Sequence, residues 1–424
     1  MGAAGRDFHN FNVYFKNNPK YKVVAFTAFQ IPGIASRKYA GIPIFPEECL
    51  ADLIKKNDAQ EVFFSYSDIS YEDLARKAAM VTAAGANFCL LGCEQTTLKS
   101  QKPVIAVTAV RTGCGKSAVS QFVADYFSKK GLRVAVIRHP MPYGDLKKQV
   151  CQKFCVLSDL EKHNCTIEER EEYEPYLEKG FAVYAGVDYE KILRLAEKDN
   201  DVILWDGGNN DTPFYKPDLY LCLADARRPN HEISYYPGEI NFRNADIIII
   251  SKADGPKENV EIILRNKKRL NPGAKIIKGS FSLTVDQPEL IKGKKVLIVE
   301  DGPSMTHGEL PHGAGFEAAR KFGAARIVDP RFYASGSLKK IFKDYSHIGK
   351  ILPAMGYSRK QRKELEEIIN RADCDSVVMA TPSRLERFLK INKPCVRVNY
   401  GFKEIDGNNF YKYLLCFKRN LVLQ

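Results

Sequence analysis

The sequence has no long hydrophobic segment. No apolar run among its 424 residues approaches the ~18 residues that a membrane-spanning helix requires. Its first ten residues, MGAAGRDFHN, lack the basic start and apolar stretch of a secretory signal peptide. Without such a signal, the 11 scattered cysteines are typical of reduced thiols. These absences predict a cytoplasmic protein that has no membrane partner.

Signatures of nucleic-acid binding are also missing, although the formal net charge is +13. No zinc-finger, RNP-type or basic-arm pattern accompanies the lysines and arginines. A basic balance of this kind also suits anionic small molecules. We therefore expect a small anionic substrate and no nucleic-acid partner. The cysteines and histidine of residues 151–165 do not have the usual zinc spacings, so we predict no metal site there.

The sequence contains no internal repeat, and its length predicts two to three domains. Residues 1–100 alternate predicted strands (21–29, 61–67 and 87–93) with a helix (71–85), as in a small Rossmann-like βαβ domain. The glycine-bearing turn at residues 2–5 normally follows a strand. The expectation is that the start codon was placed too late, or that this sheet lacks its first strand.

Residues 101–280 contain continuous Val/Ile/Leu runs, which are typical of a parallel sheet covered by helices on both faces. Residues 281–424 add further strands and helices, either as a separate domain or as an extension of the central sheet. The sequence therefore predicts an α/β fold in three parts, with a P-loop NTPase-type sheet in the middle. The predicted strands of the last two parts are 104–110, 133–139, 201–208, 218–225, 245–254, 274–280, 295–303, 325–330 and 375–382, and the predicted helices are 315–324 and 359–372.

The stretch VIAVTAVRTGCGKSAVSQF (104–122) resembles the phosphate-binding template G-x-x-x-x-G-K-[ST], with Val110 in place of the first glycine. A strand, a glycine-bearing loop and a helix are the context in which backbone N–H groups bind phosphate. Lys116 is predicted to pair with the β/γ-phosphates and Ser117 to ligate Mg²⁺. The residues expected to bind the nucleotide here are Gly113, Cys114, Gly115, Lys116, Ser117 and Ala118.

The missing glycine is explained by the variant pattern K-G-G-x-G-K-[ST]. Arg111 falls on the extra lysine of this pattern, and Thr112 stands where the pattern has glycine. In that class a second cation near the start of the loop stabilises phosphate charge, often across a dimer. Arg111 is therefore predicted to be a catalytic, charge-stabilising group in a homodimer, or else a member of a local ion pair.

Two further motifs favour a nucleotide site. Asp206 follows the apolar run of the predicted strand 201–208, where a carboxylate can hold Mg²⁺, although Asp-Gly-Gly is also good turn chemistry. The run Ser251-Lys252-x-Asp254 follows another strand and matches the [NST]-K-x-D motif that reads guanine. We expect Lys252 and Asp254 to contact the base, and the choice between ATP and GTP stays open.

Polar loops after other strands are candidates for substrate binding, because open parallel sheets bind ligands beyond the carboxyl ends of their strands. Arginine-rich loops suit phosphate groups, and the glycine-rich loop 299–315 resembles a second anion cradle. For each loop, an ordinary surface loop is the alternative. The acidic helix 166–176 is expected to be a solvated face, with an interface role as its alternative. The predicted substrate-binding residues are Arg138, His139, Tyr143, Asp145, Arg227, Arg228, His231, Asn241, Arg243, Thr306 and His307.

Taken together, these segments resemble the cyclic 2,3-diphosphoglycerate synthetases and their bacterial relatives, which are often described as GTPases. The resemblance spans essentially the whole chain in the same order. It rests on the strings MGAAGRDFHNFN, AVRTGCGKS, RHPMPYGDL, HNCTIEEREEYEPY, VYAGVDYEKIL, LWDGGNND, YYPGE, THGELPHGAG and LPAMGY.

The resemblance implies a Mg²⁺-dependent ligase or phosphotransferase. ATP would donate a phosphoryl group to one phosphate of 2,3-diphosphoglycerate, and the second phosphate would displace it to close a cyclic anhydride. Because many functions can share one fold, the acceptor stays open. The rival interpretations are a GTPase switch or chaperone that acts on a protein partner, and a carrier in which residues 1–100 bind CoA or a dinucleotide.

Overall fold

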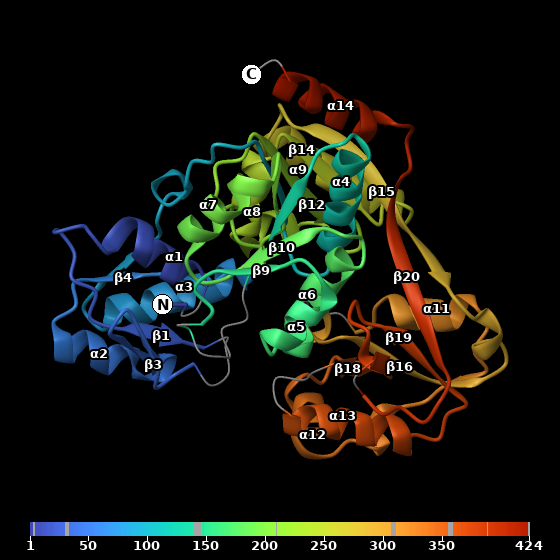
Figure 1. The fold of residues 1–424 in the computed structure, drawn as a ribbon. Helices are drawn as coiled ribbons and strands as arrows, with labels where there is room; N and C mark the ends of the chain where they lie inside the picture. Colours follow the sequence, from blue (N-terminus) through green and yellow to red (C-terminus); the bar gives the residue numbers. More distant parts are fainter. Residues whose placement is uncertain are drawn as a thin grey trace.

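Among the residues that the structure describes, 13 strands form one sheet, and helices pack on both of its faces (Figure 1). The structure is a computed structural model, and it describes residues 1–2, 5–29, 34–139, 146, 148–208, 210–306, 311–354, 359–387 and 389–422. The fold is mixed α/β, as predicted. In the described residues, no helix is both long and apolar enough to cross a bilayer.

The central part of this sheet has the strand order β15-β14-β12-β7-β11-β8-β10-β9. The adjacent pairs from β15 to β10 are parallel, and β9 runs antiparallel to β10. These strands form because runs of β-branched residues fit a pleated surface that is buried on both sides. Their bounds are β7 Val104–Ala109, β8 Val134–Ile137, β9 Gln152–Phe154, β10 Ala182–Ala185, β11 Val202–Trp205, β12 Leu219–Asp225, β14 Ile247–Ser251 and β15 Lys275–Val285.

Alternate residues of β7 enter two different cores, as the period of a strand requires. Ile105 and Val107 pack in a core with residues of α4, α9 and α14, whereas Val104 and Ala106 pack in another core with residues of α7. The parallel strands are therefore covered on both faces, and their carboxyl ends meet at one edge. The helices of this part are α4 Lys116–Lys129, α5 Leu157–Lys162, α6 Ile167–Leu177, α7 Tyr189–Asp199, α8 Gly238–Asn244, α9 Lys257–Leu270 and α14 Asn409–Val422.

The C-terminal strands join this sheet through β15. The first residues of β15 pair in parallel with β14, and residues 279–285 pair antiparallel with β20. Beyond β20 the order continues through β19, β16 and β17, and β18 also pairs with β16. The elements of this region are β16 Lys295–Asp301, α10 Gly302–Thr306, α11 Ala314–Lys321, β17 Arg326–Ile327, α12 Gly336–Asp344, β18 Leu352–Ala354, α13 Arg359–Arg371, β19 Ser376–Ala380 and β20 Cys395–Glu404.

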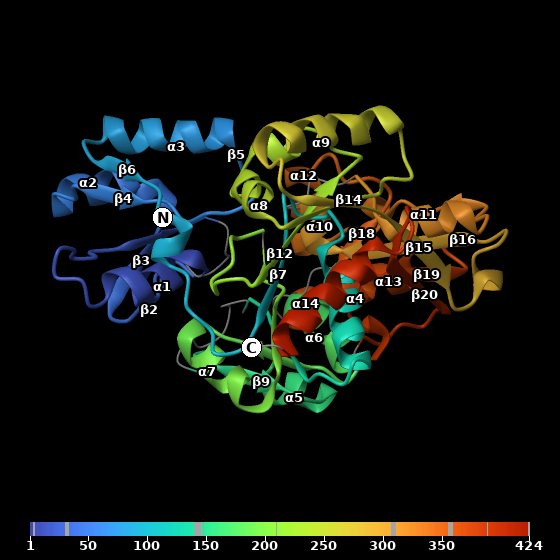
Figure 2. The same cartoon turned by 90° about the horizontal axis from the view of Figure 1, so that it is seen from above.

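The N-terminal region lies on the opposite side of the central sheet from the C-terminal strands (Figures 1 and 2). It is fastened by antiparallel pairing of its strand β5 with β13 of the central region. A cavity of about 710 Å³ in this region is lined by residues of 1–27 and 50–65, outside the phosphate loop. The elements are α1 Arg6–Asn10, β1 Phe26–Ala28, β2 Lys38–Tyr39, β3 Ile42–Pro46, α2 Leu50–Asn57, β4 Glu61–Phe63, β5 Ile69–Ser70, α3 Tyr71–Ala83 and β6 Asn87–Cys89, with β13 at Tyr235–Tyr236.

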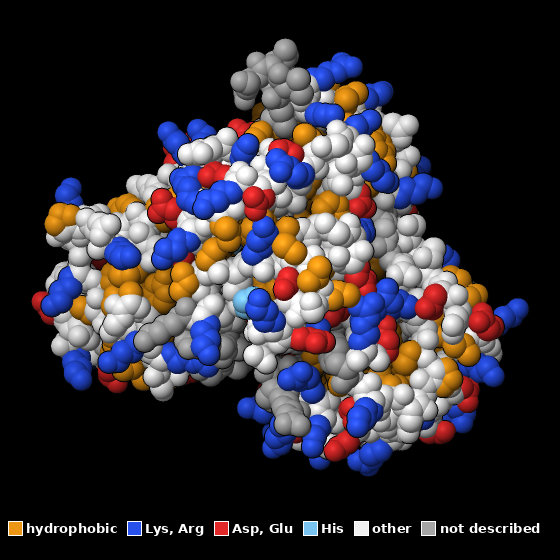
Figure 3. All heavy atoms as spheres, viewed as in Figure 1, with side chains coloured by type: hydrophobic (Ala, Val, Ile, Leu, Met, Phe, Trp, Pro, Cys, Tyr) orange, Lys and Arg blue, Asp and Glu red, His pale blue; other side chains and the backbone are white. Residues whose placement is uncertain are grey.

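The basic side chains do not gather into one patch on the face seen in Figure 3. Lysines and arginines there alternate with acidic residues over the central and C-terminal regions. This dispersed pattern is that of a solvated surface.

Candidate active site

The loop between β7 and α4 has the backbone geometry of a phosphate loop. Gly113 and Gly115 have φ values of +82° and +93°, in the left-handed region that glycine adopts freely. A Cβ on Gly115 would lie 2.1 Å from the Phe281 ring, so the position has no room for a side chain. Val110 needs no such freedom, because its N–H donates to Leu223 O at 2.9 Å and continues the strand ladder.

Lys116 begins α4 and points across the sheet edge to the end of β11. Its Nζ donates to Asp206 Oδ1 at 2.8 Å, to Asp206 O at 2.7 Å and to Gly207 O at 2.9 Å. Burial lowers the pKa of Lys116, and the Asp206 carboxylate partly offsets this. The two residues that the sequence assigned to phosphate and to Mg²⁺ are thus direct partners.

The Asp206 carboxylate is fully buried and accepts from several further groups. Ser120 Oγ donates to Oδ1 at 2.7 Å, Tyr176 OH donates to Oδ2 at 2.6 Å, and Arg138 Nη1 lies 2.5 Å from Oδ2. Burial alone would raise the pKa of Asp206, but the charges of Arg138 and Lys116 hold it below its usual value. The Asp206 carboxylate is therefore kept in its charged form.

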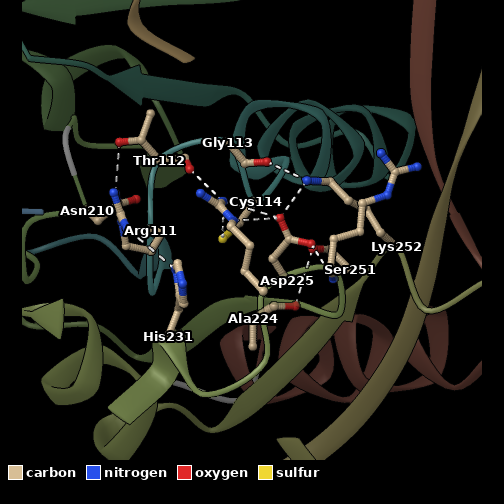
Figure 4. A network of polar contacts seen from close by, with 12 residues as sticks. Arg111, Thr112, Gly113, Cys114, Asn210, Ala224, Asp225, His231, Ser251 and Lys252 are labelled. Atoms are coloured by element: carbon tan, nitrogen blue, oxygen red, sulfur yellow. Dashed lines mark hydrogen bonds and ion pairs between the residues drawn. The ribbon is translucent and has the colours of Figure 1, made fainter. Parts of the chain in front are cut away.

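A second carboxylate, Asp225, braces the loop from the end of β12 (Figure 4). Lys252 Nζ contacts Asp225 Oδ2 at 2.6 Å and donates to Gly113 O at 2.9 Å. Arg228 Nη2 lies 3.2 Å from the same oxygen and donates to Thr112 O at 2.7 Å. Two cations that Asp225 holds therefore fix two carbonyls of the phosphate loop.

The position of Lys252 beside the loop bears on the predicted base contact. Asp254 follows it in an exposed turn beyond β14, at the same edge of the sheet as the loop. The motif is thus placed where a base attached to loop-bound phosphates could reach it, and base recognition by Asp254 stays a prediction.

Arg111 is a member of a local ion pair. Its Nε donates to Asp68 Oδ1 at 2.7 Å, and its guanidinium carbon lies 3.7 Å from the centroid of the Tyr235 ring. Nη1 lies 3.5 Å from His231 Nδ1. Only 2% of Arg111 is exposed in this chain, and a charge-stabilising role for this side chain stays a prediction. The homodimer itself stays a prediction.

The first predicted substrate loop contributes two residues to the described site. Arg138 lies 2.8 Å from Glu172 Oε1 as well as against Asp206. His139 accepts from or donates to Tyr189 OH at 2.6 Å through Nδ1, and its Nε2 lies 3.1 Å from Asp211 Oδ2. Tyr143 and Asp145 of this loop, like His307, lie outside the described residues.

The side chains of the second predicted substrate loop lie in different surroundings, and their role in binding substrate stays a prediction. Arg228 and His231 reach the phosphate loop. Arg227 is 58% exposed, and Arg243 is 47% exposed and pairs with Glu239 one turn earlier on α8. Asn241 is buried and accepts from Tyr220 OH at 2.6 Å. The helical period of α8 separates its residues, so Arg243 faces solvent while Asn241 faces the core.

In the described residues of the predicted second anion cradle, a carboxyl group of the chain lies at the start of α11. Glu300 at the end of β16 accepts the N–H of Phe316 at 2.8 Å through Oε1. A Cβ on Gly313 would lie 2.8 Å from Oε2 of Glu300. Thr306 is buried and donates to Gly302 O at 3.0 Å. In the described part of this loop, the start of α11 thus faces a carboxyl group of the chain itself.

Glu300 gives a testable pH dependence. Burial raises its pKa to about 7, against the effect of the backbone N–H groups of Phe316, Gly313 and Gly315. A raised carboxyl pKa destabilises the folded state as pH rises from about 4.5 to 7, and the cost persists above that range. Glu300→Gln should therefore raise the free energy of unfolding by up to about 3 kcal/mol at pH 8 and leave it unchanged at pH 4. Urea unfolding at both pH values measures this, and equal effects at the two would contradict it.

The acidic helix is an interface, and the expectation of a solvated face is wrong. Glu168, Glu171 and Glu174 of α6 are buried. Thr381 Oγ1 donates to Glu171, and the Arg384 N–H donates to Glu174 Oε2 at 2.7 Å. The helix is buried because it lies between the phosphate-loop edge and the C-terminal region. Its predicted start at Thr166 is confirmed by a capping box with Glu169.

Sequence reasoning did not identify several residues of the site, namely Asp68, Ser120, Glu172, Tyr176 and Asp225. Asp225 follows the apolar run of a predicted strand, as Asp206 does, and that position could have marked it. Ser120 lies one helical turn after the loop. The other three come from distant segments, and their sequence neighbourhoods carry no phosphate-site pattern.

Comparison with known proteins places the chain among synthetases. It is 57% identical over 416 residues to arginine synthetase ArcE of Thermococcus kodakarensis, which covers 96% of this chain and 93% of that protein. It is 26% identical over 318 residues to the cyclic 2,3-diphosphoglycerate synthetase of the same organism, with 66% and 70% covered. No family model matches.

Among solved structures, LpxK from Aquifex aeolicus, in complex with ATP, aligns with a TM-score of 0.43 and 13% identity, and covers 86% of this chain and 98% of that one. The long alignment with ArcE, together with the phosphate loop, shows that the protein is an NTP-dependent enzyme. The resemblance noted from the sequence motifs is confirmed. The chain belongs to the family of synthetases that contains arginine synthetase ArcE and the cyclic 2,3-diphosphoglycerate synthetases.

Proposed function

We propose that this enzyme uses an NTP and Mg²⁺ to make arginine from a ureido amino acid and ammonia. The observation that best supports NTP chemistry is the contact between Lys116 Nζ, at the end of the phosphate loop, and the Asp206 carboxylate. The 57% identity to a protein named arginine synthetase supports the choice of product. Replacing one guanidinium nitrogen of arginine by oxygen gives the ureido compound citrulline, which is the acceptor that we propose.

The proposed reaction has two steps. The ureido oxygen attacks the γ-phosphorus, the bond to the bridging oxygen breaks, and NDP leaves. Ammonia, formed when ammonium loses a proton, then adds to the ureido carbon. Phosphate departs with the former ureido oxygen, so a C–N bond replaces the C–O bond. The cyclisation that the family resemblance implies follows the same logic, because an oxygen is first phosphorylated and phosphate is then displaced.

Residues of the site have separate roles in this proposal. When nucleotide binds, the Lys116 ammonium would leave Asp206 and contact the β/γ-phosphates instead. The N–H groups of the loop would bind the same phosphates. The Ser117 hydroxyl and the Asp206 carboxylate are oxygen donors of the kind that Mg²⁺ prefers, and the ion would neutralise charge between the phosphates. Arg138, already 2.5 Å from Asp206, supplies positive charge at the same edge. Arg111 adds charge at the start of the loop.

The test compares acceptors with one enzyme preparation. Protein, Mg²⁺ and either ATP or GTP are incubated with citrulline and ammonium, or with 2,3-diphosphoglycerate. Arginine is measured by chromatography, and cyclic anhydride by phosphorus NMR. We expect arginine and phosphate in equal amounts. A cyclic anhydride signal without arginine would contradict citrulline as the acceptor and would identify 2,3-diphosphoglycerate as the acceptor instead.

A guanine-specific switch is the second candidate, and the Lys252 and Asp254 motif favours it. In that case GTP turnover would not respond to either small acceptor. Running both nucleotides in the same assay therefore separates the two functions, because only the synthetase requires citrulline and ammonium together for rapid phosphate release.

A further inference from the structure

Asp68 is a residue of the N-terminal region that contacts the phosphate loop. It lies in the turn between β4 and β5 with φ +60°, in the left-handed region that Asp enters at modest cost. The adjacent strand β5 pairs with β13, and the Tyr71 N–H donates to Ser234 O at 3.0 Å. The turn is therefore held against the central region by backbone bonds, which fix where the Asp68 carboxylate lies.

This carboxylate binds two successive residues at the start of the loop. Oδ1 accepts from Arg111 Nε at 2.7 Å, and Oδ2 accepts from the backbone N–H of Thr112 at 3.2 Å. The carboxylate side chain is only 5% exposed, so these charge-assisted bonds are shielded from water and strong.

The contact completes a brace around Thr112. Its N–H is held by Asp68, its carbonyl by Arg228 at 2.7 Å, and its hydroxyl by Asn210 at 3.1 Å. Figure 4 shows Asn210 in contact with Thr112 and His231 in contact with Arg111. Arg228 and Asn210 come from the central region, whereas Asp68 comes from the N-terminal region. The shape of the loop thus depends on both regions.

We infer that Asp68 is a positioning residue for the NTP reaction. Through Asp68, the N-terminal region fixes the positions of the Arg111 side chain and of the Thr112 backbone N–H. This inference rests on NTP turnover at the phosphate loop, as proposed above, and does not depend on the identity of the acceptor. A displacement of about 1 Å in a catalytic constellation can cost ~10²-fold in rate. Asp68 does not touch the phosphates in this account, and it acts through Arg111 and Thr112.

The test uses the full chain with Asp68→Ala and Asp68→Asn. Rate constants and KM for the NTP are measured both with acceptor and for basal hydrolysis. Asp68→Ala is expected to lower kcat ~10²-fold, and Asp68→Asn about tenfold, because the amide can still accept one bond. Asp58→Asn is the matched control, since Asp58 is in the same region, has φ +48° and is exposed; its rate should equal that of the wild type.

A double-mutant cycle separates positioning from folding. Arg111→Ala and Asp68→Ala should be non-additive, with the pair losing about as much as the larger single change. Folded protein is quantified by thermal unfolding in each sample, and kcat is expressed per folded molecule. Unchanged kcat in Asp68→Ala, or fully additive losses, would overturn the inference. Basal hydrolysis keeps this test separate from the proposed product, because it can be measured even if no arginine forms.

Discussion

Lys116→Ala is expected to lower NTP turnover by about 10³-fold, the scale of loss when a group that stabilises charge in the transition state is removed. The Lys116 ammonium is the cation that the loop sets at the end of β11, 2.8 Å from Asp206 Oδ1. The fold should persist, because Arg138, Ser120 and Tyr176 continue to satisfy Asp206. Phosphate release with Mg²⁺ and either ATP or GTP measures the loss.

Lys129→Ala is the matched control for this prediction. Lys129 lies at the other end of α4 and is exposed, so its removal should leave turnover unchanged. If Lys116→Ala retained full turnover, the loop between β7 and α4 would not be the NTP site.

Asp206→Asn is expected to affect both activity and stability. An amide retains one acceptor but turns its NH₂ group toward donors that now have no partner. Turnover should fall by ~10²-fold or more and should no longer saturate at low Mg²⁺ concentration. The free energy of unfolding should fall by about 3 kcal/mol, because a buried charge pair is broken. Urea unfolding and Mg²⁺ titrations of phosphate release measure the two effects.

The pH dependence of this variant has a definite sign. The pKa of Asp206 is held below its usual value. The stability that Asp206 contributes is therefore present above the unfolded pKa of about 4 and is lost as pH falls through the lower folded value. The difference between wild type and Asp206→Asn should persist from pH 8 to pH 5 and shrink in stronger acid.

Asp201→Asn is the control for stability. Asp201 lies just before the same strand and pairs with Arg133 at 2.9 Å on the surface. A solvent-exposed ion pair contributes about 0–1 kcal/mol. Equal losses in Asp206→Asn and Asp201→Asn would contradict the buried, charge-storing role of Asp206.

The sequence predicted those strands and that loop whose structure follows from the residues within the segment itself. The strands β7, β11, β12 and β14 are continuous apolar runs, and the loop before Lys116 has its glycines where positive φ is needed. Such features follow from the period of a strand and the freedom of glycine.

The remaining contacts depend on which segments meet in three dimensions. Tyr176 donates to Asp206 across 30 positions, and Asp68 binds Arg111 across 43. An acidic helix such as α6 has the composition of a surface, and only its packing between two regions buries its carboxylates. Arg243 has the composition of a phosphate ligand, yet the helical period turns it to solvent. Charge and residue type indicated the chemistry of the site. They could not show which residues from distant segments would meet there.

The most direct measurement is the dependence of phosphate release on the acceptor. Wild-type protein with Mg²⁺ and NTP is assayed alone, with citrulline, with ammonium, and with both, while arginine is quantified in the same samples. We predict rapid phosphate release only when both are present, one arginine for each phosphate, and loss of both products in Lys116→Ala. Phosphate release that proceeds at the same rate with and without citrulline and ammonium, and without arginine, would contradict it.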